Sequence, residues 1–224
     1  MQRLSPQERL SRRIYCRDLY HCPLIWYLAS TNRDKLKEFQ HILKSYRVKL
    51  KFPVDEGILF DISETGKTLK ENALIKAEHL YKIVKKPVLS DDTGLFVPHL
   101  DGAPGIFSSR FAGENSSYLE NRKKLLRLLE GIPFHKRSAK FKTVICLYMG
   151  NEIQFFEGQV HGFITSEERG YSGFGYDPIF LYPPLGRTFA EIPLHLKNRI
   201  SHRAKAIGAL LDFLKKSHGK GNIF

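Results

Sequence analysis

The chain has 224 residues, of which 42% are hydrophobic and 26% charged, a composition that excludes intrinsic disorder, collagen and a coiled-coil rod. No apolar run approaches the roughly 18 residues of a membrane helix, so no integral membrane segment is expected. The 36 Lys and Arg residues exceed the 23 Asp and Glu residues, and the resulting charge of +13 suits nucleic acid, anionic lipid or a polyphosphate substrate.

Residues 1–23 are predicted to be an N-terminal extension outside the fold, because they are polar and Arg-rich and lack an apolar core of signal-peptide length. The cysteines Cys16, Cys22 and Cys146 are odd in number and irregularly spaced. Their pattern argues against a disulfide scaffold or a zinc cage and is consistent with a reducing compartment, so a cytoplasmic protein is expected.

The first predicted unit is a strand, a turn and a helix. The apolar run at residues 24–28 indicates a buried strand, and a polar turn follows at residues 30–32. The helix after it has one apolar face, formed by Leu36, Phe39 and Leu43. A second helix is predicted from Thr68, with Glu71 at capping-box spacing, and it stops before Pro87.

The rest of the chain alternates in the same way. A short strand is predicted to begin at residues 88–89, and a helix is predicted from Ser117, again with a capping-box Glu120, to Gly131. A long β-hairpin follows over residues 141–148 and 153–164. A Gly-rich loop, a strand at 179–182 and a last helix complete the chain; the apolar face of that helix is formed by Ile200, Ala204, Ile207, Leu211 and Leu214.

Interleaved helices and strands with one long hairpin predict a mixed α/β sheet flanked by helices. We expect a cleft between the sheet and the hairpin. One domain is predicted over residues 24–217, followed by a C-terminal tail at 218–224.

Four segments could carry chemistry. The first runs from residue 30 to residue 35, where the strand gives way to the helix. Free backbone N–H groups at a helix start form an anion site, and Lys35 adds a positive charge. A triphosphate would fit there, although N-capping by Asn32 or Thr31 with a solvated lysine explains the same residues.

The second segment is Asp91-Asp92-Thr93-Gly94. Two adjacent carboxylates after a buried strand are costly unless a cation neutralises them, and Mg²⁺ prefers a few carboxylates together with phosphate oxygens and water. One of the aspartates could hold the metal while orienting or deprotonating a water. A solvent-exposed Asp-rich turn is the alternative.

The last two segments offer groups for recognising a base. In the Gly-rich loop at residues 170–178, Phe174 and Tyr176 could stack on a base; a hairpin turn with core aromatics is the alternative. Lys197, His202 and Arg203 lie just before or at the start of the last helix. Cations at a helix start are better explained if an anion or a carbonyl-rich base binds there, although a solvated basic face is the usual reason for such residues.

Together these segments resemble the inosine triphosphate pyrophosphatase family. The resemblance spans about residues 25–216 and rests on motifs in family order: LASTNRDKLKEF, ETGKTLKENALIKA, SDDTGLFVPHLDGAPGIFSSRFAG, GFGYDPIF and KNRISHRAKAI. It implies a mixed α/β fold with a strongly curved sheet flanked by helices, two lobes with a central cleft, and usually a homodimer. It also implies Mg²⁺-dependent hydrolysis of ITP, dITP or XTP to the monophosphate and pyrophosphate.

The family's roles pass to the matching positions. Residues 30–35 and Lys76 would hold the triphosphate, and residues 174–177 would enclose the base and sugar. Lys197, His202 and Arg203 would complete the base pocket, with donors directed at the 6-oxo group. The expected substrate-binding set is therefore Ser30, Thr31, Asn32, Arg33, Asp34, Lys35, Lys76, Thr93, Phe174, Gly175, Tyr176, Asp177, Lys197, His202 and Arg203.

Asp92 is expected to be the catalytic residue, as general base or metal-linked carboxylate, with Asp91 in support. Mg²⁺ is expected to bind to Asp92 and Glu64. Glu71 and Asp91 are the alternatives to Glu64, because the family often has two acidic residues where this chain has Ser63 and Glu64. Two further positions depart from the family: Thr31 replaces a glycine, and Thr93 replaces a common serine.

Two other functions remain open. A related class of nucleotide pyrophosphatases acts on other bases. The charge of +13 also permits a non-catalytic nucleic-acid-binding protein, but the basic residues are spread out and no RNA-binding sheet signature is present, so no specific nucleic acid partner is expected.

Overall fold

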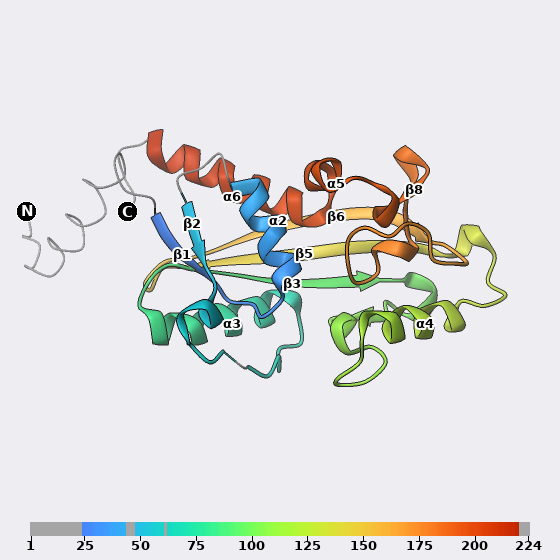
Figure 1. Cartoon of the computed structure of the whole chain (residues 1–224), viewed down its shortest axis with the longest axis horizontal. Coiled ribbons are helices and arrows are strands. Elements are labelled where there is room, and N and C mark those ends of the chain that lie inside the picture. The colour runs from blue at the N-terminus through green and yellow to red at the C-terminus, as the bar shows by residue number, and fades with distance from the viewer. Residues whose placement is uncertain (1–23, 44–47, 61, 220–224) are drawn as a thin grey trace, which may run out of the picture.

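The structure is a computed structural model that describes residues 24–43, 48–60 and 62–219 (Figure 1). The predicted extension at 1–23, with Cys16 and Cys22, and residues 220–224 of the predicted tail lie outside the described residues. The last helix extends to Gly219, two residues beyond the predicted domain end.

All described strands belong to one mixed sheet, ordered β2-β1-β3-β5-β6-β7-β8, with β4 attached to β3. β1 lies parallel to β2 and β3, and the other neighbours are antiparallel. The strands are β1 (Leu24–Leu28), β2 (Val48–Lys51), β3 (Val88–Phe96), β4 (Pro104–Gly105), β5 (Ser138–Tyr148), β6 (Ile153–Ile164), β7 (Phe180–Tyr182) and β8 (Arg187–Thr188).

Helices cover both faces of this sheet, with α2, α5 and α6 on one face and α3 and α4 on the other (Figure 1). The α-helices are α2 (Arg33–Leu43), α3 (Leu69–Val84), α4 (Tyr118–Leu128), α5 (Leu194–Ile200) and α6 (His202–Gly219). Short 3₁₀ helices occupy the connections: Pro53–Glu56, Pro98–Leu100, Ser108–Arg110, Phe134–Lys136, Asp177–Ile179, Pro183–Leu185 and Phe189–Glu191. The mixed α/β fold is therefore confirmed.

The apolar periodicity of each helix places its core face on the sheet. Phe39 of α2 and Ile207 of α6 pack in one buried cluster with Ile145 of β5, whereas Ala77 and Leu80 of α3 pack on the opposite face. A third cluster joins α4 to the far ends of β3, β5 and β6. Each face thus buries the apolar surface that the sequence pattern predicts.

The predicted helix starts are confirmed by their capping contacts. The Thr68 hydroxyl accepts a hydrogen bond from the backbone N–H of Glu71, and Ser117 and Glu120 form a reciprocal capping box. The Ser201 hydroxyl accepts from the N–H of Ala204 at the start of α6. These side chains satisfy N–H groups that have no partner within the helix.

The prediction for residues 88–94 was wrong in one respect. The short strand predicted here does not end before the two carboxylates, because β3 continues through Asp91 and Asp92 to Phe96. Both carboxylates are buried, and each has a cationic partner in Lys35 or Lys76. Opposite charge makes a buried carboxylate tolerable in a strand, and the local sequence does not reveal those distant partners.

The strong curvature expected for the sheet is not observed, and β5 and β6 run long and nearly straight in Figure 1. Their pairing is continuous from Ser138 opposite Phe163 to Tyr148 opposite Ile153, and the β3–β5 pairing is equally uninterrupted. A β-bulge is the usual device that bends a strand, and neither pairing contains one. The division into two lobes stays a prediction.

Gly158 of β6 lets α6 lie directly against the sheet. A Cβ atom at Gly158 would be 2.1 Å from the carbonyl oxygen of His202 and 2.5 Å from the amide nitrogen of Ala206. Because backbone atoms cannot yield as a side chain can, we expect Gly158→Ala to lower the free energy of unfolding by about 1–3 kcal/mol, measured by urea denaturation.

The matched control for this prediction is Gly208→Ala in α6, where a Cβ atom would have no neighbour within 4 Å. Alanine favours a helix over glycine, so this variant should be unchanged or more stable by up to about 1 kcal/mol. Equal stability of the two alanine variants would contradict the close packing of α6 on Gly158.

Candidate functional site

The candidate site lies at a gap along one edge of β3. β5 pairs with β3 along its whole length, so β1 and β4 share the other edge. β1 pairs with β3 only as far as Leu89, and β4 pairs with β3 only from Leu95 onward. Among the described residues, residues 90–94 therefore have no strand beside them on that edge, and side chains from both faces of β3 reach one pocket there.

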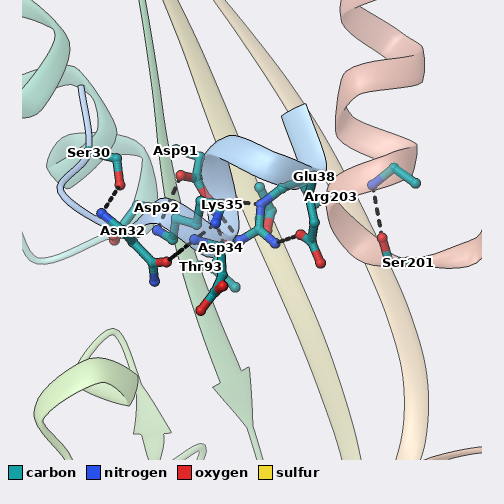
Figure 2. A network of polar contacts seen from close by, with 12 residues as sticks. Ser30, Asn32, Asp34, Lys35, Glu38, Asp91, Asp92, Thr93, Ser201 and Arg203 are labelled. Atoms are coloured by element: carbon teal, nitrogen blue, oxygen red, sulfur yellow. Dashed lines mark hydrogen bonds and ion pairs between the residues drawn. The ribbon is translucent and has the colours of Figure 1, made fainter. Parts of the chain in front are cut away.

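Only part of the turn at residues 30–35 lines this pocket, namely Asn32 and Lys35. The Asn32 side-chain oxygen caps α2 by accepting from the N–H groups of Asp34 at 2.9 Å and Lys35 at 3.3 Å. The Ser30 hydroxyl accepts from the N–H of Asn32 (Figure 2). N-capping and a lysine that faces the pocket therefore coexist, although the sequence presented them as alternatives.

Four residues of this turn are not part of the pocket lining, and Ser30, which accepts from the N–H of Asn32, is one of them. Thr31 is exposed, Arg33 pairs with Asp55 at 2.8 Å on the surface, and Asp34 lies 3.5 Å from Lys37. The substrate contacts predicted for these four residues have no counterpart in the pocket lining.

Asp91 and Asp92 project to opposite faces of β3, as neighbouring residues of a strand do. The Lys35 ammonium lies 3.1 Å from one Asp91 oxygen and the Arg203 guanidinium 3.1 Å from the other (Figure 2). Burial alone would raise the pKa of Asp91, but these charges outweigh it and hold the pKa well below its ordinary value. Asp91 is thus a fixed anion that orients two cations, while Thr93 on the same face hydrogen-bonds to it and lines the pocket.

Asp92 belongs to a separate cluster on the α3 face. The Lys76 ammonium donates to Asp92 at 2.8 Å, to Glu64 at 2.7 Å and to the backbone carbonyl of Asp91 at 2.8 Å. Burial raises the pKa of Asp92, and the nearby Glu64 carboxylate adds to the rise against the opposing charge of Lys76. Lys76 does not itself line the pocket, whereas both carboxylates do.

This carboxylate pair fits Mg²⁺. Asp92 and Glu64 are hard oxygen donors that contact the same ammonium, so they lie close together and repel each other. Within the described residues, no three His, Cys, Asp or Glu side chains gather as a metal cage. Mg²⁺ typically takes one or two carboxylates and completes its shell with phosphate oxygens and water.

The alternatives to Glu64 as second ligand are placed elsewhere. The Glu71 carboxylate accepts from the backbone N–H of Lys67 at 2.6 Å, which is a structural role at the start of α3. Asp91 faces Lys35 and Arg203 on the opposite face of the strand. Of the three candidates, only Glu64 shares a partner with Asp92 and lines the pocket.

The Gly-rich loop contributes an aromatic wall. Phe174, Gly175, Tyr176 and Asp177 all line the pocket. The Phe174 ring lies 4.8 Å from the Lys197 ammonium and 5.7 Å from the Arg203 guanidinium. The loop is held by Asp177, which accepts from the N–H of Phe174 at 2.8 Å, and by the buried Tyr176, whose hydroxyl donates to the carbonyl of Ser108 at 2.9 Å.

Lys197 and Arg203 also line the pocket, but their charged groups are engaged by buried carboxylates. Lys197 pairs with Glu38 at 2.8 Å and with Asp177 at 2.5 Å. Arg203 pairs with Glu38 and Asp91 (Figure 2). Glu38 of α2 was not predicted from the sequence, because helical periodicity places it away from the apolar stripe of its helix. It is nevertheless buried against α5 and α6.

His202 brings to the site a buried ring nitrogen that has no hydrogen-bond partner among the described residues. Its ring stacks on Phe141 with centroids 4.5 Å apart, and the unpartnered nitrogen is Nδ1. Burial, reinforced by the charges of Arg203 and Lys197, lowers the pKa of His202 well below 6.5. At neutral pH the imidazole is therefore uncharged and offers one donor and one acceptor.

A pocket that combines lysine ammonium groups, a carboxylate pair and an aromatic wall defines a protein that binds a phosphorylated aromatic compound. The chain belongs to the Ham1 family, whose model matches residues 26–213. A relative from Thermoanaerobacter sp. (strain X514), named dITP/XTP pyrophosphatase, is 48% identical over 189 residues, which cover 84% of this chain and 96% of the relative.

Solved structures agree with this assignment. A HAM1 protein from Coxiella burnetii superposes with a TM-score of 0.78 at 42% identity, covering 86% of this chain and 99% of that one. The Ham1 protein of Staphylococcus aureus gives a TM-score of 0.77 at 39% identity, with the same coverage. These comparisons confirm the family that the sequence motifs predict.

Proposed function

We propose that the protein hydrolyses the non-standard purine nucleoside triphosphates ITP, dITP and XTP to the nucleoside monophosphate and pyrophosphate. The observation that carries the proposal is the Asp92–Glu64 carboxylate pair beside the Asn32–Lys35 turn, in one pocket with the Phe174 ring. The curated name of the relatives, dITP/XTP pyrophosphatase, supports the same substrates.

The reaction would be a substitution at the α-phosphorus. Asp92 accepts a proton from a water, the water oxygen bonds to the α-phosphorus, and the bond between that phosphorus and the bridging oxygen of pyrophosphate breaks. Lys35, whose side chain lines the pocket, would hold the phosphates and offset the negative charge that pyrophosphate carries as it leaves. Lys76 keeps Asp92 oriented through the 2.8 Å contact.

Asp92 and Glu64 would hold Mg²⁺, which neutralises charge on phosphate oxygens when bound. The predicted substrate contacts of Ser30, Thr31, Arg33 and Asp34 stay predictions.

The base would stack on Phe174 and meet His202. A neutral imidazole with an unpartnered nitrogen can donate a hydrogen bond to a 6-oxo group, whereas a 6-amino group cannot accept it. A site built to hydrogen-bond one substrate group rejects an analogue without it by roughly 10⁴-fold in favourable cases. Lys197 and Arg203 would act mainly by fixing the aromatic wall and the start of α6.

The family resemblance further supports a domain over residues 24–217, two lobes with a central cleft, a homodimer and a cytoplasmic location. Within the described residues, no helix has the length and apolar character that a membrane crossing requires. A specific nucleic acid partner is not part of the proposal.

The test is release of pyrophosphate from ITP, XTP, GTP and ATP, first with Mg²⁺ and then with EDTA. We expect release from ITP and XTP at least about 100-fold faster than from ATP, because its 6-amino group cannot accept the hydrogen bond from His202, and we expect EDTA to abolish it. We also expect slower release from GTP, which shares the 6-oxo group and must be excluded by a second feature near the 2-position. Orthophosphate as the product would mean that a different bond is cut. Equal rates with GTP or ATP would contradict the base preference.

A further inference from the structure

Tyr118, the first residue of α4, lies at the pocket and was not among the residues predicted from the sequence. Its side chain lines the pocket while 41% of the residue stays exposed, which places it at the opening. Tyr118 contacts two of the segments that form the site, the turn at Asn32 and the aromatic loop at Phe174.

The contact with Asn32 fixes how the Tyr118 hydroxyl can act. The Asn32 side-chain oxygen is committed to capping α2, so the amide NH₂ group faces away and donates to the Tyr118 oxygen at 2.7 Å. The phenol oxygen is thus an acceptor in this contact, and its own proton remains to be donated. No described residue accepts that proton.

The phenol also keeps its proton at neutral pH. Burial raises the pKa of Tyr118 above its ordinary value of 10. The hydroxyl is therefore a donor at the pocket without a protein acceptor among the described residues, and it is held in place by Asn32.

The second contact locates this donor relative to a bound nucleotide. The Tyr118 ring lies 6.0 Å, centroid to centroid, from Phe174, the residue that would stack on the base. Asn32 belongs to the turn that would hold the phosphates. A residue that touches both lies where the phosphate chain meets the nucleoside, which is the α-phosphate.

The position of Tyr118 is rigidly set by the rest of α4. Arg122 lies four residues later, on the same side of the helix. Its guanidinium donates to the carbonyl of Gly175 at 2.9 Å and makes two contacts of 3.0 Å with the Glu168 carboxylate. These contacts tie α4 to the aromatic loop, so Tyr118 keeps its distance from Phe174.

We infer that Tyr118 is a further substrate-binding residue, whose hydroxyl donates a hydrogen bond to an oxygen of the α-phosphate. The inference rests on the proposed function for the identity of the nucleotide. An α-phosphate oxygen is charged, and hydrogen bonds to charged groups are the stronger ones.

The test is Tyr118→Phe, which removes the hydroxyl and keeps the ring against Phe174. We expect KM for both ITP and dITP to rise about tenfold, equivalent to about 1.4 kcal/mol, with kcat little changed, because the contact forms before the chemical step. The Kd of IMP, which retains the α-phosphate, should rise by a similar factor. Tyr171→Phe is the matched control, because Tyr171 is fully exposed, and it should leave KM, kcat and Kd unchanged.

Several outcomes would overturn the inference. An unchanged or lowered KM and Kd would remove Tyr118 from the substrate site. A rise with ITP but not with dITP would mean that the hydroxyl contacts the sugar 2′-OH instead of the phosphate. If Tyr118 acts only by holding Asn32, the double variant Asn32→Ala/Tyr118→Phe will bind as weakly as Asn32→Ala alone.

The proposed function and this inference fail in different ways. If the wild-type protein releases no pyrophosphate from ITP, the proposed function fails. The comparison of IMP binding by wild type and Tyr118→Phe still decides the role of Tyr118 in that case.

Discussion

Replacing Asp92 with Asn lowers kcat for ITP by a factor of about 10²–10⁴ if Asp92 accepts the proton of the attacking water. The amide has the size of the carboxylate but cannot take up a proton at neutral pH. It is also a poorer ligand for Mg²⁺, so activity should not return at saturating metal. The measurement is pyrophosphate release by purified Asp92→Asn across a range of ITP and Mg²⁺ concentrations.

The same substitution should leave the fold intact, because Lys76 retains its 2.7 Å ion pair with Glu64 and its hydrogen bond to the Asp91 carbonyl. Thermal unfolding of the variant is therefore expected near the wild-type midpoint. Asp212→Asn, an exposed aspartate of α6, is the matched control and should change neither activity nor stability. A rate within about threefold of wild type in Asp92→Asn would remove Asp92 from the chemistry, since a base contributes far more.

Replacing Glu38 with Gln is expected to be the most damaging change to stability among those considered. Glu38 is buried and neutralises both Lys197 and Arg203. The glutamine fills the same space but leaves the buried Lys197 and Arg203 each with one anionic partner fewer. We expect the free energy of unfolding to fall by about 3 kcal/mol, the lower end for broken buried ion pairs, because Asp177 and Asp91 remain as partners.

Urea denaturation measures this effect, with Glu78→Gln as control. Glu78 forms an exposed ion pair with Lys82 one turn along α3, which contributes about 0.3–0.5 kcal/mol. The charges of Arg203 and Lys197 outweigh burial and hold the pKa of Glu38 below 4.5. The contribution of Glu38 to the free energy of unfolding is therefore fully present above pH 4.5 and is lost as the pH falls further. The difference in free energy of unfolding between wild type and Glu38→Gln should narrow at that lower pH. A loss below about 1 kcal/mol at pH 7 would contradict the buried network.

Much of the fold could be predicted because its signals are local. The apolar run of β1, the caps at Thr68 and Ser117 and the alternating hairpin of β5 and β6 act on neighbouring residues. The length of β3 could not be predicted, since an acidic strand interior depends on Lys35, Lys76 and Arg203 from other elements. Strand curvature likewise depends on bulges, which the apolar pattern does not reveal.

The site shows the same division. Motifs singled out Asp92, Lys35 and the aromatic loop, all of which reach the pocket. Glu38 lies within the motif LASTNRDKLKEF but was assigned no role, and Tyr118 lies outside the quoted motifs. Each acquires its role only when another element packs beside it. The sequence also could not show that Arg33 turns toward Asp55 or that Lys197 and Arg203 are occupied by carboxylates.

The chain of alternating charges from Asp177 through Lys197, Glu38 and Arg203 to Asp91 has a consequence for how this protein can evolve. Each member neutralises its neighbours, so no single member can change sign or lose its charge without leaving another ion unbalanced inside the protein. Viable sequences should differ here by paired, compensating exchanges rather than by single steps. Amino-acid substitutions should therefore accumulate more slowly at these five positions than in the apolar core, where residues of similar volume replace one another at little cost.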